Sequence, residues 1–220
     1  MNVYPSVSSC RVCERGIPRV FLRIDGKTYW RCLKCAATFL APEFHPSPEE
    51  EQAHYRLHQN DPGDSRYRKF LSKLGDPLLS KLEGPSRGLD YGCGNGPALA
   101  AVFREAGHEV VLHDPFFADN PEALSQQYDF IICAEVVEHF HDPLRDFRRL
   151  DRLLKPRAWL GIMTCFQTDD DRFADWHYRK DPTHVVFYRE ETLRVVAEQR
   201  EWECEIPCKD VALMQKGDRR

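Results

Sequence analysis

The sequence predicts an α/β protein in which a doubly wound, mainly parallel sheet follows a small module built around cysteines. From residue 87 onward, short apolar segments alternate with helical ones, as in folds whose parallel sheet is covered on both faces. Before that, two Cys-x2-Cys pairs fall within the first 35 residues. A chain of 220 residues can hold one ordinary domain plus such a module. We expect the cysteine module at residues 1–41, a linker with helices at 42–86 and the sheet domain at 87–220.

The cysteine module has the spacing of a zinc ribbon, with 18 residues between its two cysteine pairs. Two residues between cysteines let both thiolates reach one ion, and two such pairs complete a tetrahedral shell around a structural Zn²⁺. The β-rich halves between the pairs flank Asp25-Gly26, which is a hairpin signal. A redox-active pair would be expected to open a helix after a strand, and neither pair does. The predicted ligands are Cys10, Cys13, Cys32 and Cys35.

Composition indicates a reduced, cytoplasmic protein. The nine cysteines are an odd number, and the first ten residues lack a charged stretch followed by an apolar one, as a signal peptide would have. No apolar run approaches the ~18 residues that a membrane-spanning helix needs, so we expect no membrane partner. The net charge of −4 argues against a chain coated in positive charge, and no DNA partner is expected.

The positive charge that is present gathers in the ribbon. Residues 1–40 hold seven Lys and Arg against two Asp and Glu. With the aromatic side chains of this region, these residues could contact the phosphates and bases of RNA. A solvated hairpin face packed on the main domain is an equally good interpretation. The basic residues are Arg11, Arg15, Arg19, Arg23, Lys27, Arg31 and Lys34.

Three prolines between residues 41 and 48 mark a boundary, after which helices are expected. Ser47-Pro48-Glu49-Glu50 is a helix start, and the helix should run to about residue 59. Residues 64–74 and 77–82 look like further helical pieces. Four polar residues cluster near the end of the first helix, and they either close over a cofactor or lie on a solvated surface. They are His54, Tyr55, His58 and Asn60.

The main domain alternates strands and helices. Strands are expected at 87–91, 109–113, 129–134 and 159–164, and helices at 97–106, 143–154 and 190–199. Residues 202–208 and 210–216 suggest a closing pair of strands. Such a sheet binds its ligand at the carboxyl ends of its strands.

The most informative segment is GLDYGCGNG at residues 88–96. A buried strand that breaks into glycines at 92, 94 and 96 brings bare backbone close to a ligand, and the following helix offers its free N–H groups. Asp114 ends the next strand about 20 residues later, where a carboxylate can accept hydrogen bonds from both hydroxyls of a ribose. A nicotinamide dinucleotide would satisfy this geometry too.

These segments resemble the class I S-adenosylmethionine-dependent methyltransferases. The resemblance covers roughly residues 50–215 and rests on LDYGCGNG, the strand end at Asp114, and YDFIICAEVVEHFHDP followed by LDRLLKPRAWLGIMT. It is closest to small methyltransferases with an E-V-x-E-H motif after the fourth strand, here residues 135–139. DPTHVVFY at residues 181–188 also resembles a segment of that group.

The resemblance implies a Rossmann-like methyltransferase sheet of the seven-stranded type and a set of cofactor contacts. The glycine turn would hold the methionine end of S-adenosylmethionine, and Asp114 would take the ribose hydroxyls. The third strand is short or missing, because about fourteen residues separate Asp114 from the next strong strand; Pro115, Phe116 and Phe117 could enclose the adenine instead. The implied cofactor-binding residues are Asp90, Gly92, Gly94, Asn95, Gly96, Asp114, Pro115, Glu135 and His139.

The loop after Thr164 would carry the acceptor chemistry. In-line methyl transfer needs alignment, and it needs a base only where the acceptor must lose a proton. His184 is the preferred base, with Tyr178 and His177 as further catalytic candidates. His184 could instead cap a loop or bind cofactor. Cys165 lies where RNA cytosine-5 methyltransferases place a nucleophile, but the proline-cysteine of that family is absent.

Several functions remain open from sequence. The acceptor is either RNA gripped by the ribbon or a small metabolite. A non-catalytic nucleotide- or RNA-binding protein on this fold is disfavoured by the intact turn with Asp90 and Asp114. A nicotinamide-dependent oxidoreductase is disfavoured by EVVEH, which dinucleotide folds do not require. Fold alone names neither the methylated atom nor the oligomeric state.

Overall fold

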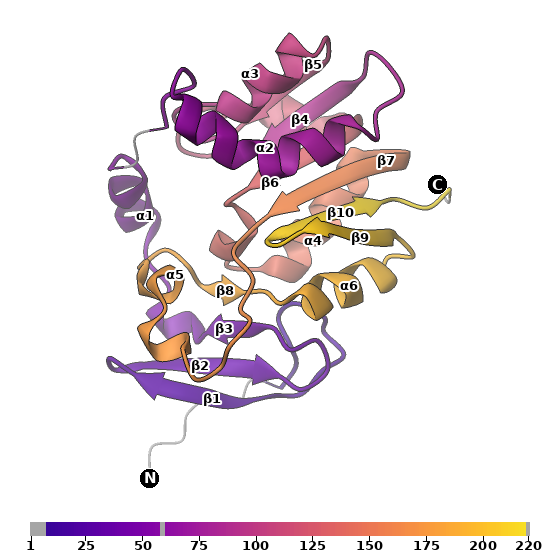
Figure 1. Cartoon of the computed structure of the whole chain (residues 1–220). Helices are drawn as coiled ribbons and strands as arrows, with labels where there is room; N and C mark the ends of the chain where they lie inside the picture. Colours follow the sequence, from indigo (N-terminus) through magenta and orange to yellow (C-terminus); the bar gives the residue numbers. More distant parts are fainter. Residues whose placement is uncertain (1–7, 58–59, 219–220) are drawn as a thin grey trace.

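The computed structural model describes residues 8–57 and 60–218 and places a six-stranded mixed sheet at the centre of the molecule (Figure 1). The strand order is β5-β4-β6-β7-β10-β9. The first four strands in this order pair in parallel, and β10 pairs antiparallel with both β7 and β9. The strands are β4 (Arg87–Tyr91), β5 (Glu109–His113), β6 (Tyr128–Ala134), β7 (Leu154–Met163), β9 (Glu203–Cys208) and β10 (Val211–Gln215).

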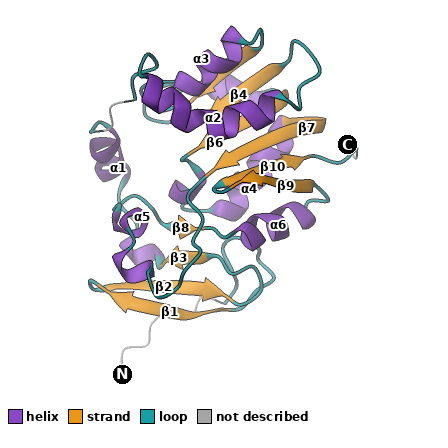
Figure 2. Ribbon diagram, in the orientation of Figure 1, coloured by secondary structure: helices purple, strands orange, loops and turns teal. Residues whose placement is uncertain are grey.

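Helices cover both faces of this sheet, which confirms the predicted doubly wound α/β class (Figure 2). Because successive strand residues point to opposite faces, Phe130 and Ile132 pack with α2 and α3, whereas Ile131 and Cys133 belong to the core that includes α4 and α6. The helices are α1 (Pro48–Tyr55), α2 (Ser65–Leu79), α3 (Ala98–Glu105), α4 (Pro143–Leu153), α5 (His177–Lys180) and α6 (Glu190–Glu198). Short 3₁₀ turns are η1 (Pro42–Phe44), η2 (Pro121–Ser125), η3 (Val137–His139) and η4 (Phe173–Asp175).

The cysteine module forms a second sheet of order β1-β2-β3-β8. Its strands are β1 (Pro18–Ile24), β2 (Lys27–Cys32), β3 (Thr38–Leu40) and β8 (Val186–Phe187). The hairpin predicted at Asp25-Gly26 is present, with Ile24 paired to Lys27 and positive φ at both turn residues. The fourth strand, β8, comes from the part of the chain that follows the central strand β7.

The third strand typical of this kind of sheet is absent from the described residues between β5 and β6. Asp114 forms an isolated bridge with Ala118 instead, and η2 follows. Fourteen residues, 114–127, join the two strands. The short spacing in the sequence predicted this difference, and the sheet accordingly has β5 at its edge.

The helices before the sheet differ from expectation at their ends. The first ends at Tyr55 rather than near residue 59, and His58 and Gln59 lie outside the described residues. The two expected pieces at 64–74 and 77–82 are one helix, α2, which continues through Pro77. A proline cannot donate to the carbonyl four residues before it, and the Sγ of Cys208 lies 3.7 Å from that carbonyl, on Lys73.

Strand β7 starts five residues earlier than the apolar pattern predicted. Helix α4 ends at Leu153 and the chain enters β7 at once, with Leu154 opposite Tyr128. The apolar pattern did not predict this start because Lys155–Arg157 lie at the less buried end of the strand, where apolar side chains are not required.

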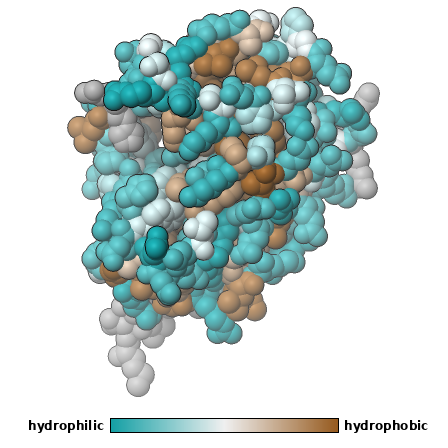
Figure 3. All heavy atoms as spheres, viewed as in Figure 1, coloured by the Kyte–Doolittle hydropathy of each residue, from teal (hydrophilic) through white to brown (hydrophobic). Residues whose placement is uncertain are grey.

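Most of the molecular face drawn in Figure 3 is polar, with apolar side chains in scattered patches. In the described part of the chain, no helix combines the length and the apolar character that crossing a membrane requires.

Gly88 in β4 tests how tightly the sheet packs against the α2–α3 layer. A Cβ at this position would lie 2.2 Å from atoms of the Phe130 ring, which is fully buried and stacked on Phe103. We expect Gly88→Ala to lower the free energy of unfolding by about 1–3 kcal/mol, as overpacking does. Chemical denaturation measures this, with Gly63→Ala as the control, since its new methyl would meet only the exposed Asp61 side chain. Equal stability of the two variants would contradict the packing described.

Candidate active site

A cavity of about 760 Å³ opens at the carboxyl ends of β4, β5 and β6. Its size falls within the range of small-molecule and cofactor sites. The glycine turn, the loop after β5, the turn η3, helix α1 and the segment around α5 all contribute to its walls. All twelve residues predicted to bind cofactor or take part in catalysis line it: Asp90, Gly92, Gly94, Asn95, Gly96, Asp114, Pro115, Glu135, His139, His177, Tyr178 and His184.

The glycine turn needs its glycines for two different reasons. Gly92 and Gly94 have φ values of +80° and +63°, which side chains rarely adopt. Gly96 needs space instead, because a Cβ there would lie 1.6 Å from the backbone oxygen of Asn60. The segment that follows α1 therefore lies directly on the turn.

Asp114 connects the turn to the loop after β5. Its carboxylate accepts hydrogen bonds from the backbone N–H groups of Gly94 at 3.0 Å, Phe116 at 2.8 Å and Phe117 at 3.1 Å. The side chain is buried at the edge of the cavity. Three backbone donors hold this side chain in place, which fixes the position of both segments.

Asp90, at the end of β4, is a buried carboxyl beneath the turn. Burial raises the pKa of Asp90 to about 7, although a hydrogen bond to the backbone of Ala100 lowers it in part. A carboxyl with this pKa changes its charge near neutral pH, so a cation placed beside it would favour the ionised form.

Glu138 is fully buried beside His139 and Tyr178, two residues that line the other end of the cavity. The Tyr178 hydroxyl donates to its Oε1, and the Thr164 hydroxyl lies 3.0 Å from the Tyr178 oxygen. Its other oxygen, Oε2, has no hydrogen-bond partner among the described residues. Burial, and then the neighbouring Glu135, raise the pKa of Glu138; burial likewise raises the pKa of Glu135, which has a φ of +55°.

His139 and His184 face each other beside Glu138, with ring centroids 4.7 Å apart. The Nδ1 of His139 lies 3.1 Å from the carbonyl of Thr183, and that of His184 lies 2.7 Å from the carbonyl of Tyr178. A carbonyl only accepts, so each Nδ1 carries the proton, and Nε2 is the basic nitrogen of the neutral ring. One ligand atom from each of Glu138, His139 and His184 lies within 4.8 Å of the others, so the three could hold a metal ion.

Helix α1 closes over this end of the cavity. The Tyr55 ring packs edge-on against His139, with centroids 5.2 Å apart, and also contacts Phe116. His54 Nε2 lies 3.1 Å from Asp181 Oδ2. Of the cluster noted in the sequence, Tyr55 and Asn60 line the cavity, His54 pairs with the lining residue Asp181, and His58 lies outside the described residues.

Asp181, in the loop expected beside the cleft but not among the predicted catalytic or cofactor-binding residues, lines the cavity. Burial would raise the pKa of Asp181, but the charge of His184, hydrogen bonds from Thr183 and the contact with His54 lower it to about 2. A second contact that sequence spacing could not reveal pairs Glu51 of α1 with His141 at 3.0 Å, again at the cavity wall.

The remaining catalytic candidates occupy different environments. His177 lines the cavity but is exposed, whereas Tyr178 is buried and its hydroxyl is engaged by Glu138. Cys165 is not among the residues that line the cavity, and burial raises the pKa of its thiol to about 11. A thiol with this pKa is a poor nucleophile at neutral pH.

The four ribbon cysteines form a buried cluster separate from the cavity, whose lining includes no described residue before Glu51. Cys10 Sγ lies 3.7 Å from Cys35 Sγ, and Cys13 Sγ lies 3.7 Å from Cys32 Sγ. A tetrahedral Zn–S shell with bonds of ~2.3 Å requires sulfur separations of about 3.8 Å. Backbone N–H groups of Val12 and Cys13 also point at Cys10 Sγ. The cluster is compatible with a zinc ribbon.

Comparison with known families agrees with this geometry. Residues 63–205 match a family model described as a methyltransferase domain. The chain belongs to this family. The predicted enzyme class, a methyltransferase dependent on S-adenosylmethionine, is thereby confirmed. The narrower E-V-x-E-H group stays a prediction.

Solved structures of the same fold include two with TM-scores above 0.5. The 1,6-didemethyltoxoflavin-N1-methyltransferase of Burkholderia thailandensis, with 1,6-didemethyltoxoflavin and S-adenosylhomocysteine bound, is 17% identical (TM-score 0.54), and the match covers 91% of this methyltransferase and 99% of that chain. A SAM-dependent methyltransferase from Archaeoglobus fulgidus is 20% identical (TM-score 0.51; 68% and 94% covered). The chain spans 55% of the length of a calicheamicin-biosynthesis methyltransferase that is 13% identical (TM-score 0.45; 69% of this chain covered). No curated protein matches the sequence.

The buried carboxyl of Glu138 makes the stability of this methyltransferase depend on pH. Its pKa is raised in the folded state, so between the ordinary glutamate pKa and the raised value the folded state binds more protons, and stability falls as pH rises. From about pH 5 to about pH 8, we expect the wild type to lose roughly 1 kcal/mol or more relative to Glu138→Gln, which can still accept from Tyr178. Urea unfolding at both pH values measures this, and parallel pH dependences would contradict it.

Proposed function

We propose that this methyltransferase transfers the methyl group of S-adenosylmethionine to a small molecule that enters the cavity beside His184. The observation that carries the proposal is the composition of the cavity wall. One cavity holds both the glycine turn and the histidine cluster, helix α1 covers it, and no described ribbon residue lines it. A ribbon that gripped RNA would be expected to border the site. This arrangement favours a small acceptor over RNA.

At the cofactor end, the glycine turn with Asn95 would receive the methionine moiety, and Asp90 would lie near its positive charges. Binding would then ionise Asp90, whose pKa burial raises to about 7. Asp114 would turn its carboxylate toward the ribose hydroxyls, with Pro115 and Phe116 beside the adenine. Glu135 and His139 would line the space where the sulfonium methyl points.

At the acceptor end, His184 would act as the general base. Its Nδ1–H donates to the Tyr178 carbonyl, which holds the ring so that the basic Nε2 can take the acceptor proton. His139 would orient the acceptor, and His177 would contact it from the exposed rim. Tyr178 would act through Glu138, since its hydroxyl donates there. The chain's contribution is then alignment of the acceptor with the methyl group and removal of its proton.

A second candidate for this end is a divalent cation held by Glu138, His139 and His184. Three observations favour it: their ligand atoms lie close together, each histidine donates its Nδ1–H to a carbonyl as metal ligands do, and Glu138 Oε2 lacks a partner among the described residues. A bound cation would orient an acceptor oxygen and lower its pKa. The two roles of His184 exclude each other, because a ligated Nε2 cannot take a proton.

We further propose that the cysteine cluster holds a structural Zn²⁺, since a four-cysteine shell leaves no open position for chemistry. All nine cysteines are unpaired, which supports the cytoplasmic location expected from sequence.

Asp114 provides the test of the cofactor site. We expect Asp114→Asn to weaken S-adenosylmethionine binding about tenfold or more, because hydrogen bonds to a charged group contribute ~1.5–3 kcal/mol each. The matched control is Asp119→Asn, the same change at an exposed position of the same loop, which should bind as the wild type does. Calorimetric titration measures both, and equal affinities would contradict the assigned role.

Metal analysis tests the two metal sites separately. We expect one Zn²⁺ per purified chain, lost in Cys35→Ser. Mn²⁺ prefers oxygen and nitrogen ligands, so electron paramagnetic resonance of a Mn²⁺ titration reports on the histidine cluster alone. Binding of one Mn²⁺ to the wild type and to His177→Ala, with no binding to His139→Ala, would support the cation site. If the wild type binds no Mn²⁺, His184 keeps its proposed role as general base. A chain without zinc would refute the ribbon site.

A further inference from the structure

One wall of the proposed acceptor side of the cavity rests on the cysteine module, whereas His139 on this side comes from η3, after β6 of the central sheet. We define residues 166–188, which follow β7, as the acceptor-wall segment; it carries Tyr178, Asp181 and His184. Its last strand, β8, pairs with β3, with Thr38 opposite Phe187 and the Leu40 N–H donating to the Val185 carbonyl. Figure 1 shows β8 and α5 beside the module's strands.

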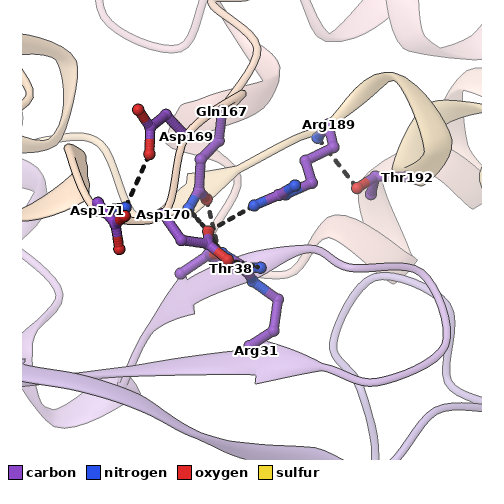
Figure 4. Close-up of polar contacts among 8 residues, drawn as sticks. All are labelled: Arg31, Thr38, Gln167, Asp169, Asp170, Asp171, Arg189 and Thr192. Atoms are coloured by element: carbon purple, nitrogen blue, oxygen red, sulfur yellow. Dashed lines mark hydrogen bonds and ion pairs between the residues drawn. The ribbon is translucent and has the colours of Figure 1, made fainter.

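A closed ring of side-chain hydrogen bonds joins the start of this segment to β2 and β3 (Figure 4). Arg31 donates from Nε to Thr38 and from Nη2 to Asp170 Oδ1 at 2.7 Å. The Thr38 hydroxyl donates to Gln167 Oε1. Gln167 Nε2 in turn donates to Asp170 Oδ1, which closes the ring. Arg189, just beyond the segment, donates to the same Asp170 oxygen. The bond between Thr38 and Gln167 is buried, whereas the Asp170 carboxylate that closes the ring is partly exposed to solvent.

A second contact holds the middle of the segment. Arg179 of α5 is buried, and both of its terminal nitrogens lie 3.2 Å from Asp25 Oδ2, at the tip of the module's hairpin. Nearby, Phe173 is fully buried, with its ring 5.3 Å from that of Phe21 and 5.1 Å from that of Phe187. The segment is thus fastened at its start, middle and end.

The opposite side of the segment faces the reacting groups. Val185 donates its N–H to the carbonyl of Glu138, and the Tyr178 hydroxyl donates to the same residue's carboxylate. The His184 ring is fixed by the Tyr178 carbonyl, which α5 supplies. Any shift of the segment against the module would therefore move His184 relative to Glu138.

We propose that Asp170 and Arg179 are positioning residues through which the cysteine module sets the geometry of the acceptor site, while the cofactor end is formed by the loops after β4 and β5 and by Asn60. The module then positions the acceptor-wall segment and does not itself bind the substrate. The proposal deepens the proposed function, because it rests on His184 lying at the acceptor end.

The test compares Asp170→Asn with Asp171→Asn in the full chain. Both changes remove one negative charge from an exposed carboxyl, but only Asp170 forms an ion pair with Arg31, and the Asp171 carboxylate has no hydrogen bond to the described residues of the module. In Asp170→Asn we expect amide hydrogen exchange across residues 166–188 to rise about tenfold, with β4 and β6 unchanged, because local opening there loses its charged contacts. The ring ¹⁵N resonances of His184, assigned with His184→Gln, should move as well. Asp170→Glu should restore both, and Arg179→Gln should reproduce the loss.

S-adenosylmethionine affinity is measured on the same samples and should stay within about twofold of the wild type. Unchanged exchange and unchanged His184 resonances in Asp170→Asn and Arg179→Gln would overturn the proposal, as would an equal rise of exchange throughout the central sheet. Absence of cofactor binding in the wild type would count against the proposed function instead, since the exchange measurement needs no ligand.

Discussion

A carboxyl buried where three parts of the chain meet constrains the end of the cavity that we propose for the acceptor. Glu138 is held by η3 at the end of β6, receives the Tyr178 hydroxyl from α5, and accepts the Val185 N–H beside β8 through its backbone carbonyl. Burying a carboxyl without partners is costly, so the surrounding groups must supply hydrogen bonds. That requirement links the central sheet to the acceptor-wall segment, and through β3 to the cysteine module. The site is therefore completed only when both sheets are formed.

The cavity is also unusual in its charge. Asp90 and Glu135, which line it, and Glu138, which contacts the lining residue Tyr178, all have pKa values raised chiefly by burial. These carboxyls are protonated more readily than ordinary ones, and a cation brought among them would release protons as it binds. S-adenosylmethionine carries a sulfonium and an ammonium group. Carboxyls that can ionise when a cation binds favour such a ligand. The demethylated product lacks the sulfonium, so its electrostatic attraction to these carboxyls is weaker.

The sequence predicted the features that depend on residues close together in the chain. The alternating apolar strands, the positive-φ glycines at 92 and 94, the hairpin at Asp25-Gly26 and the four-cysteine spacing each follow from neighbours along the chain. The short interval after Asp114 even indicated the missing third strand. Contacts between distant segments could not be read in this way. Nothing near Asp170 in sequence points to Arg31, and β8, only two residues long, carries no pattern that would place it beside β3. The helix through Pro77 was missed because tertiary packing outweighed the local cost of proline.

We expect this cavity to bind S-adenosylmethionine and not a nicotinamide dinucleotide, which the glycine turn and Asp114 would also fit. Isothermal titration calorimetry of the full chain with each ligand tests it most directly. Saturable binding of S-adenosylmethionine at one site per chain, with no binding of NAD, is the expected result. Absence of heat with S-adenosylmethionine, or saturable binding of NAD in its place, would refute the assigned cofactor.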